Sequence, residues 1–339
     1  MYKKSFMSNK IDFVVSWIND SDPKWIENKN RYFDKTSDIN DILIAECRYR
    51  DWGFIRYWFR SVEKYAPWVN KIHFITYEHI PEWLNTSHEK LNIIKHSDYI
   101  PSEYLPTFNS DVIEMNIHRI KELSEQFVLF NDDLFLNDYV SEKFFFKNNL
   151  PRGSAIFTTI VPNSNFSYIA LNNTLIINKH FDKRKVIKKY FWKFFNFRYH
   201  YHNLRNLIFN YPPKITCFRE HHTANALLKI TLEEIWVKEN LLLDKVSKNK
   251  FRSKEDVNQW LIKNWQFMQG KFQPINPDYT HSFAISTDNS LILKALKEKK
   301  YKVICINDTN MDFDFEKAKK ELITALQIKF PQKSSFEID

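Results

Sequence analysis

Glycine, cysteine and long apolar runs are scarce in this sequence, and each shortage excludes a class of protein. The 339 residues include three glycines, whereas a Walker loop or a dinucleotide-binding fingerprint needs two or three glycines within a few positions. Both loops are therefore excluded, and any phosphate must be bound by arginines, a metal ion or helix N-termini. The three cysteines are far apart and follow no metal-binding spacing, so we expect ordinary thiols in a reducing cytoplasm.

The sequence also disfavours a membrane-spanning or exported protein. No stretch approaches the roughly 18 to 20 continuous apolar residues of a membrane span, and residues 1–10 lack the apolar segment of a secretory signal. Apolar residues nevertheless make up 43% of the chain and aromatic residues 17%, a composition that suits a packed core and not a disordered chain. We expect an N-terminal extension, residues 1–10, followed by a single domain over residues 11–339.

Apolar runs of strand length alternate with helical patterns along the chain. Most of the runs lack polar residues at every second position, which indicates strands covered on both faces; they are residues 11–17, 71–76, 91–95, 127–130, 155–160, 174–177 and 302–306. Apolar stripes with helical spacing lie in residues 55–66 and 113–123, and two further helices are expected after Thr223 and Ser253. This order predicts an α/β fold with a mostly parallel central sheet flanked by helices, in which ligands bind at the carboxyl ends of the strands.

An acidic turn formed by Asn131, Asp132 and Asp133 is the clearest candidate site. These residues follow an apolar strand directly, and apolar residues continue on the other side. Adjacent carboxylates in apolar surroundings are costly unless a partner compensates them. A divalent cation does so, and Mg²⁺ prefers one or two carboxylates together with phosphate oxygens of a substrate. A polar turn between two strands is the alternative.

A cluster of arginines is a candidate site for a diphosphate. Guanidinium groups bind phosphate bidentately, and four of them occur within thirteen residues, on Arg48, Arg50, Arg56 and Arg60. Arg56 and Arg60 lie four residues apart on one face of the expected helix, so a salt-bridged face that uses Asp51 and Glu63 is the alternative.

Other polar groups occur where helices are expected to begin. Asn19 and Asp22 follow the first strand, and a proline follows at once, so these residues either bind a nucleotide at the strand end or simply start a helix with Asp22 as its N-cap. Glu114 lies in the early turns of a helix capped by Asn109 or its neighbour. It is either a site carboxylate or an acid that complements the helix dipole.

His222 and Arg252 each stand before an expected helix. Thr223 can cap the first of these helices, and Ser253 with Asp256 has nearly the form of a capping box at the second. Anions bind readily at helix N-termini. A paired histidine or an exposed arginine at such a position is more often structural, so the local pattern leaves both roles open.

Nearly all of the net charge of +9 is concentrated in residues 179–205. That segment contains nine lysines and arginines, one acid (Asp182) and eight aromatic residues between positions 190 and 201. It predicts either a peripheral contact with the anionic inner face of the cytoplasmic membrane or an aromatic core element with lysines on its outer face. No nucleic-acid-binding motif accompanies the segment, so we expect no nucleic-acid partner.

These segments occur together and in order, and their combination resembles the Stealth family, which includes bacterial capsular polysaccharide phosphotransferases. The resemblance covers nearly the whole chain, so residues 11–339 would form a single Stealth-type catalytic domain. The family's four characteristic regions resemble residues 11–22, then 48–68 with 105–114 and 127–136, then 222–236, then 251–270; residues 302–308 and 331–337 resemble its bacterial capsule branch.

The resemblance implies a cytoplasmic sugar-1-phosphate transferase with the GT-A or Rossmann-like architecture of nucleotide-sugar transferases. Such an enzyme would move hexose-1-phosphate from a UDP-sugar to a hydroxyl of a glycan or lipid-linked glycan, form a phosphodiester in a capsular or cell-surface polysaccharide, and release UMP. Contacts with capsule assembly proteins would follow. Carried over residue by residue, the resemblance implicates Asn19, Asp22, Glu114, Asp132, Asp133, His222 and Arg252.

Roles for these residues follow from the implied reaction. Asp132 and Asp133 would hold a divalent cation, Mg²⁺ or Mn²⁺, against the diphosphate, and Arg252 would stabilise charge on the transferred phosphoryl group. His222 is the expected general base because histidine titrates nearest neutral pH. Glu114 is the competing base, and a phosphohistidine intermediate is a further alternative. Two other functions remain open: a metal-dependent glycosyltransferase that releases UDP, and a non-catalytic basic binding protein.

Overall fold

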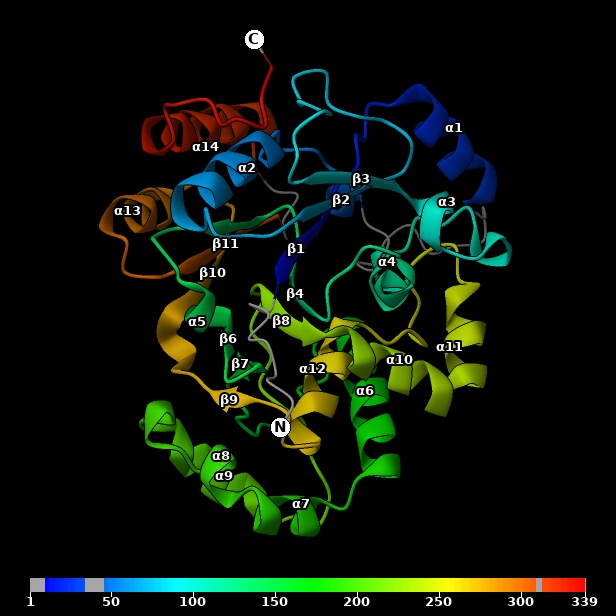
Figure 1. Ribbon diagram of the computed structural model, residues 1–339, viewed down its shortest axis with the longest axis vertical. Coiled ribbons are helices and arrows are strands. Elements are labelled where there is room, and N and C mark those ends of the chain that lie inside the picture. The colour runs from blue at the N-terminus through cyan, green and yellow to red at the C-terminus, as the bar shows by residue number, and fades with distance from the viewer. Residues whose placement is uncertain (1–9, 34–45, 309–312, 339) are drawn as a thin grey trace, which may run out of the picture.

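The structure is a computed structural model that describes residues 10–33, 46–308 and 313–338. The expected N-terminal extension, residues 1–10, therefore lies outside the described residues except for Lys10. A central sheet carries helices on both of its faces, and a group of helices forms the lower end of the molecule (Figure 1).

Five strands form the central sheet within the described chain. Their order is β3 (Leu91–Lys95), β2 (Ile72–Thr76), β1 (Ile11–Ser16), β4 (Gln126–Phe130) and β8 (Asn225–Leu228). The first four strands are parallel, and β8 runs antiparallel to β4. The predicted fold class, α/β with a mostly parallel central sheet flanked by helices, is confirmed.

Two hydrophobic cores lie on opposite faces of this sheet because successive residues of a strand point to opposite sides. Phe13 and Phe130 belong to one core, which they share with α2 (Ile55–Tyr65), α13 (Ser290–Glu298) and α14 (Phe315–Lys329). Val14 and Leu129 belong to the other core. That core is covered by α4 (Ser110–Met115), α6 (Phe166–His180), α10 (Lys229–Lys238), α11 (Asn240–Ser247) and α12 (Gln259–Met268).

A second sheet joins the C-terminal part of the chain to the acidic turn. It contains β10 (Thr280–Ala284), β11 (Val303–Asn307) and β5 (Leu134–Leu136), with β11 antiparallel to β5. Cys305 pairs with Leu134 in this ladder. Because β5 begins directly after Asp133, the pairing brings the carboxyl end of β11 to the acidic turn.

The remaining elements are short. A third sheet contains β6 (Phe146–Lys147), β7 (Leu150–Gly153) and β9 (Gln273–Pro274). The other helices are α1 (Pro23–Tyr32), α3 (His96–Tyr99), α5 (Glu142–Phe145), α7 (Lys183–Lys189), α8 (Phe191–Phe194) and α9 (His202–Asn210). Single 3-10 turns are η1 (Glu46–Arg48), η2 (Ser102–Tyr104), η3 (Ile117–Arg119), η4 (Phe197–Tyr199) and η5 (Pro277–Tyr279).

Two of the predicted strands are not strands in the structure. Residues 174–177 lie inside α6, where Ile176 and Ile177 are buried and Leu175 is exposed, so this short run is one turn of a helix with only part of it on the buried side. Residues 155–160 are buried at their start but form no strand; an isolated bridge joins Phe157 to Phe218.

The expected helix starts had mixed outcomes. Asp22 caps α1 and Asn109 caps α4, as their sequence contexts predict. Thr223 caps no helix, because the chain after it enters β8 and pairs with β4. Ser253 likewise precedes a loop, and α12 begins only at residue 259 with Asn258 as its cap.

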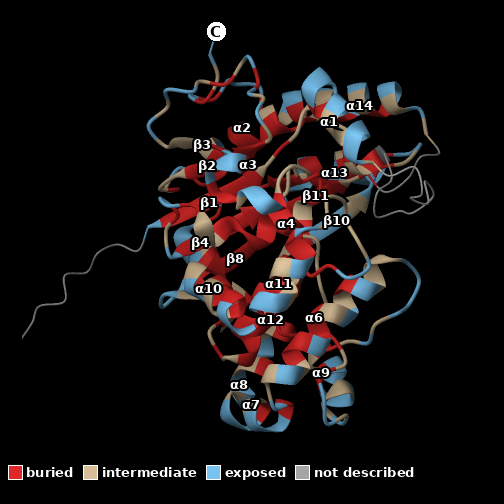
Figure 2. Cartoon of the chain, turned by 90° about the vertical axis from the view of Figure 1, so that its right-hand side faces the viewer, coloured by how far each residue is buried: buried red, intermediate tan, exposed pale blue. Residues whose placement is uncertain are grey.

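Burial decreases from the sheet toward the lower end of the molecule. Figure 2 shows buried residues concentrated around the central strands, whereas α7 and α9 present many exposed residues at that end. Within the described residues, the helices are all too short or too polar to cross a membrane.

Candidate active site

A cavity of about 490 Å³ lies where several strands end. Its walls include the residues that follow β1 (Trp17 and Ile18), those that follow β4 (Asn131 to Asp133), and Asp308 after β11. This is the location that the strand-end rule predicts for a ligand in a parallel sheet. Of the residues singled out in the sequence, the cavity brings together Arg48, Arg50, Glu114, Asp132, Asp133, His222 and Arg252.

The acidic pair has the properties of a cation site. Burial raises the pKa of Asp132 to about 8, and the neighbouring charges of Asp133 and Asp51 add to the rise. The Oδ1 atom of Asp133 is buried and accepts no hydrogen bond from the described residues. A bound cation would compensate such carboxylates, so the residues present fit the metal that the sequence predicts.

Cys305 and His222 surround the carboxylate of Asp133. The Cys305 thiol donates to Oδ2 of Asp133 over 3.2 Å, and Nε2 of His222 lies 3.6 Å from Oδ1. Burial, and then the charge of Asp133, raise the pKa of this thiol well above its usual value, so Cys305 acts as a donor. The three side chains offer ligand atoms within 4.8 Å of one another, which makes His222 a candidate ligand as well as a candidate base.

A chain of amides connects the two candidate bases. The amide nitrogen of Gln259 donates to Oε1 of Glu114 over 3.1 Å and to Oδ1 of Asn131 over 3.3 Å. The Asn131 amide nitrogen lies 3.4 Å from Nε2 of His222. Asn225 in turn donates to the side chain of Gln259 over 2.7 Å. This network holds the two bases on one wall of the cavity.

Glu114 itself is buried, and its environment favours the neutral acid. Burial raises its pKa to about 7, although the nearby charge of Arg252 and the hydrogen bonds from Gln259 act in the opposite direction. Asp111, one helical turn earlier, is also buried, and burial raises its pKa to about 8. Acids of this kind gain or lose a proton near neutral pH, which is the range that a general base needs.

Two guanidinium groups meet at the aromatic ring of Phe166. The centre of the Arg48 guanidinium lies 4.7 Å from the ring centroid, and that of Arg252 lies 5.8 Å from it. Burial, and then the charge of Arg252, lower the pKa of Arg48. Two like charges held this close favour an anionic ligand between them.

The loop before α12 delivers Arg252 to this position. Asp256 accepts hydrogen bonds of 2.7 Å from Asn109, which caps α4, and from the backbone N–H of Ser253. The Arg252 guanidinium donates to the hydroxyl of Ser110, at the start of α4. The prediction of a helix N-terminus at Arg252 is therefore wrong. These hydrogen bonds hold the loop instead, and the loop places the Arg252 side chain in the cavity. His222 likewise precedes a strand and not a helix.

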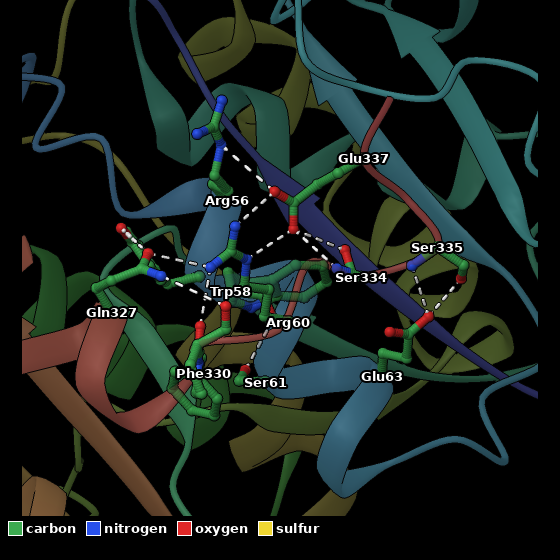
Figure 3. A network of polar contacts seen from close by, with 12 residues as sticks. Arg56, Trp58, Arg60, Ser61, Glu63, Gln327, Phe330, Ser334, Ser335 and Glu337 are labelled. Carbon is green, nitrogen blue, oxygen red and sulfur yellow. Dashed lines mark hydrogen bonds and ion pairs between the residues drawn. The ribbon is translucent and has the colours of Figure 1, made fainter. Parts of the chain in front are cut away.

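Arg56 and Arg60 lie outside the cavity, which corrects their assignment as phosphate ligands. Both side chains turn toward the C-terminal segment (Figure 3), where Nε of Arg60 lies 2.7 Å and Nε of Arg56 lies 3.6 Å from the Glu337 carboxylate. Arg56 and Arg60 do form a salt-bridged face, as the alternative interpretation predicts, but their partner is Glu337 and not Asp51 or Glu63. Glu63 instead accepts hydrogen bonds from Ser335.

Asn19 and Asp22 are also absent from the cavity lining. The Asp22 carboxylate accepts from the backbone N–H of Trp25 over 2.7 Å as the cap of α1. Asn19 Oδ1 accepts from the backbone N–H of Ser21 over 3.0 Å. The helix-start interpretation therefore describes this segment, and these two residues are not retained as ligands.

Several residues that line the cavity do not stand out in the sequence patterns. Asp308 pairs with Arg50 over 3.2 Å and follows β11, so the strand-end rule applied to that strand would have found it. Asp111 could have been found from its spacing, one turn before Glu114 on the same helix. Gln259 has no local signal, because its partners are more than 30 residues away in sequence.

Comparisons with known proteins agree with this arrangement. Residues 48–152 match the model of Stealth protein conserved region 2. The capsular polysaccharide phosphotransferase WcwK of Streptococcus pneumoniae is 47% identical over 329 residues, which cover 97% of this chain and 98% of the relative. The chain belongs to the Stealth family. This membership confirms the resemblance found in the sequence and the expectation of a transferase.

Two further relatives extend the match within the Stealth family. The exopolysaccharide phosphotransferase cps2G of Lactiplantibacillus plantarum is 37% identical, with 96% of each chain covered. The receptor polysaccharide phosphotransferase WefC of Streptococcus gordonii is 37% identical, with 98% of this chain and 100% of the relative covered. In this Stealth protein, Arg48, Glu114 and Asp133 lie inside the matched conserved region, whereas His222 and Arg252 reach the same cavity from outside it.

Proposed function

We propose that this protein transfers hexose-1-phosphate from a UDP-sugar to a hydroxyl of a glycan or lipid-linked glycan, during synthesis of a capsular or other cell-surface polysaccharide. The names of the relatives, which are phosphotransferases of capsular polysaccharide, exopolysaccharide and receptor polysaccharide, support phosphotransfer. A cytoplasmic location, where UDP-sugars are made, belongs to the same proposal.

One observation carries the proposal. A single cavity contains an acidic pair, two guanidinium groups and two candidate bases, contributed by Asp132, Asp133, Arg48, Arg252, His222 and Glu114. Phosphoryl transfer depends mainly on positioning and on stabilisation of charge, and these are the groups that it requires. The volume of about 490 Å³ also lies within the usual range of small-molecule sites.

Asp132 and Asp133 would hold a divalent cation, Mg²⁺ or Mn²⁺, which when bound would neutralise charge on the diphosphate. Their oxygen ligands suit these hard ions. The buried and unbonded Oδ1 atom of Asp133 supports this assignment. The protonated Cys305 thiol orients the same carboxylate through its hydrogen bond and is not itself a ligand in this proposal.

The chain's own residues would bind the donor and move one proton. Arg48 and Arg252 would bind phosphate oxygens, and Arg252 would stabilise charge on the transferred phosphoryl group. The acceptor oxygen would form a bond to the β-phosphorus while the bond from that phosphorus to the bridging oxygen breaks, so UMP leaves. The bond between the sugar and its phosphate stays intact, and the sugar keeps its anomeric configuration.

His222 is the proposed general base, and it would take the proton of the acceptor hydroxyl at Nε2. The side chain is 33% exposed and borders the cavity, so a large acceptor can reach it. Glu114 lies deeper and is hydrogen-bonded to Gln259. We therefore assign to Glu114 the role of holding the Gln259 amide, with the role of base as the alternative.

The identity of the leaving group tests the reaction. Incubation of the protein with UDP-sugars and a glycan acceptor should release UMP, and phosphorus NMR of the product should show a phosphodiester. Stoichiometric release of UDP, with a phosphorus-free product, would instead establish a glycosyltransferase.

Substitutions at His222 and Asp133 test the two assignments in the cavity. His222→Ala should lower turnover by about a hundredfold or more and leave Mn²⁺ binding, measured by calorimetry, unchanged; Asp133→Asn should weaken both. His281→Ala and Asp288→Asn, at exposed positions away from the cavity, are the controls. Loss of Mn²⁺ binding in His222→Ala would make His222 a ligand, and undiminished turnover would remove it from catalysis.

A further inference from the structure

Helix α9 presents most of its apolar side chains to solvent, whereas Phe209 packs against the core. Five large side chains with spacing of about one helical turn fall on one side of residues 201–211, and each is 65% to 90% exposed: Tyr201, Leu204, Leu207, Ile208 and Tyr211. An ordinary surface helix of a globular protein places its apolar stripe on the core and its polar residues in water. Here the arrangement is reversed.

The opposite side of α9 is polar and buried, which fixes this orientation. Asn206 is fully buried; its amide donates to the carbonyls of Ala155 and Phe194, and its oxygen accepts from the N–H of Phe157 over 2.7 Å. His202 is buried on the same side, next to Arg219. Rotation of the helix would break these hydrogen bonds, so they keep the apolar stripe facing solvent.

Two more exposed aromatic side chains lie in the elements that precede α9 along the chain. Trp192 in α8 is 77% exposed, and Phe197 in η4 is 74% exposed. Contiguous exposed apolar side chains are rare on monomeric proteins unless they bind something. Tryptophan and tyrosine are the residues enriched at the boundary between membrane and water, because their rings combine an apolar body with a polar group.

Exposed cations occur on α9 itself and on the neighbouring α7. Arg184, Lys185, Lys188, Lys189 and Arg205 are exposed, and the only acid between residues 179 and 214 is Asp182. In both views of the whole chain, α7, α8 and α9 together form the lower end of the molecule (Figures 1 and 2).

Lys183 does not belong to this charged surface, although the sequence places it there. It is buried, and its ammonium donates to the backbone carbonyls of Phe209 and Pro212. This contact ties the start of α7 to the end of α9. The basic helix and the apolar helix are therefore held next to each other.

We propose that the apolar side of α9, with Trp192, Phe197 and the cations of α7, docks the protein on an anionic lipid surface. An apolar stripe flanked by lysines and arginines and bordered by tryptophan and tyrosine is the pattern of an interfacial helix. A second copy of this chain fits less well. The cores of protein interfaces are depleted of lysine, and two copies would each bring the same excess of positive charge.

Docking on lipid is independent of the reaction proposed above, and its test needs no substrate. Native protein should sediment with vesicles of phosphatidylglycerol and phosphatidylcholine in equal parts, and should remain in solution with phosphatidylcholine alone. Binding should weaken at 0.5 M salt to a small fraction of its value at about 0.1 M, because the screening length falls well below 10 Å.

Two sets of substitutions separate the apolar and the charged contributions. Leu204→Gln, Leu207→Gln and Ile208→Gln together should abolish sedimentation, and Lys185→Gln, Lys188→Gln and Lys189→Gln together should weaken it by about a hundredfold, since each basic residue near an anionic surface contributes severalfold. All six side chains are exposed, so the fold should survive, as circular dichroism would show.

A matched control carries the same kind of change elsewhere. Val237→Gln with Leu241→Gln replaces apolar side chains that are 82% and 85% exposed on α10 and α11, and it should leave vesicle binding unchanged. Equal loss of binding in this control would overturn the proposal, as would failure of the native protein to bind anionic vesicles. A native dimer in sedimentation equilibrium that the Leu204, Leu207 and Ile208 substitutions convert to a monomer would also overturn it, in favour of a second copy as the occupant.

Discussion

Replacement of Arg60 by alanine should destabilise the protein without impairing the chemistry of the cavity. Arg60 and Glu337 are 6% and 2% exposed, and two parallel hydrogen bonds of 2.7 and 2.8 Å join them. Arg60 also donates to the carbonyl of Phe330 over 2.8 Å (Figure 3). Removal of one partner of a buried pair leaves an uncompensated charge, which typically costs about 3–5 kcal/mol.

The lower end of that range is expected because Glu337 keeps other partners. The backbone N–H and the hydroxyl of Ser334 donate to its carboxylate over 2.9 and 3.1 Å, and Arg56 lies 3.6 Å away. We therefore expect Arg60→Ala to lower the free energy of unfolding by about 3 kcal/mol. Arg56→Ala is the matched control. Arg56 is 40% exposed, so its loss should cost at most about 1 kcal/mol.

A double variant isolates the charge. When Glu337→Gln is combined with Arg60→Ala, no unpaired carboxylate remains, and the cost should fall to about 1–2 kcal/mol for the lost hydrogen bonds. The pair also predicts a pH dependence. Burial alone would raise the pKa of Glu337, but the hydrogen bonds from Arg60 and Ser334 outweigh burial and lower it. This contribution to stability is therefore full above the ordinary glutamate value of 4.5 and is lost as the pH falls through the lowered pKa.

Urea denaturation and steady-state kinetics measure the two effects separately. At a temperature where both proteins are folded, Arg60→Ala should keep the native KM for the donor. A raised KM with an unchanged free energy of unfolding would refute this reasoning and restore Arg60 as a phosphate ligand. If Arg56→Ala lowered the free energy of unfolding as much as Arg60→Ala, the cost of losing the arginine would not depend on its burial.

Three further predictions concern other parts of the chain. Burial raises the pKa of Glu114 from 4.5 to about 7, so ionisation of Glu114 destabilises the fold as the pH rises through that range. Glu114→Gln should therefore be more stable than the native protein by about 2–3 kcal/mol at pH 8 and equally stable near pH 4. Thermal unfolding with EDTA present measures this difference. Gly270→Ala should lower the free energy of unfolding in urea by about 2 kcal/mol or more, because the φ of Gly270 is +67° and a Cβ would lie 2.5 Å from the ring of Tyr190. At Gly53 a Cβ would meet only an atom at 3.7 Å, so Gly53→Ala should cost about 1 kcal/mol. Lys183→Met should leave carbonyls at the end of α9 without a donor and cost about 1–3 kcal/mol, seen as faster proteolysis between residues 183 and 214.

Local sequence patterns predict the central sheet well. The runs that became β1, β2, β4 and β11 are mostly apolar because these strands are buried on both faces, and that requirement acts on the strand's own residues. The run that became β3, at the edge of the sheet, is mostly half-buried. The helix caps at Asp22 and Asn109 are equally local, since each side chain bonds to a backbone N–H within three residues. The strand-end rule then places Asp132 and Asp133 in a cavity without further information.

Partners far apart in sequence could not be predicted in this way. Cys305 reads as an ordinary thiol, and its contact with Asp133 exists only because β11 pairs with β5 across 172 residues. Arg60 reads as a phosphate ligand, and its partner Glu337 lies 277 residues away. In both cases the side chain has the expected chemistry, but the fold decides what stands opposite to it.

At His222 and Arg252 the prediction that fails is the helix expected after each residue. The sequence predicts a helix after each residue, because Thr223 and Ser253 are good caps in isolation. Pairing of β8 with β4 takes up the chain after Thr223, and the Asp256 contacts with Asn109 hold Ser253 in a loop. Tertiary contacts therefore override the capping signal, yet both side chains still reach the cavity.

The charge of the cavity bears on the order in which ligands bind. Among the described residues that line it, seven carry carboxyl groups and three carry guanidinium groups. Two of these acids are paired, Asp308 with Arg50 and Glu220 with Lys263. The phosphate oxygens of a diphosphate would lie close to the acidic pair Asp132 and Asp133, and a cation that entered first or with them would offset the repulsion. Burial and then the charges of Asp133 and Asp51 raise the pKa of Asp132, and a cation bound beside it would favour its ionised form. Binding of UDP should therefore be at least about tenfold weaker in EDTA than in Mg²⁺, and equal affinities in calorimetry would show that the arginines alone suffice.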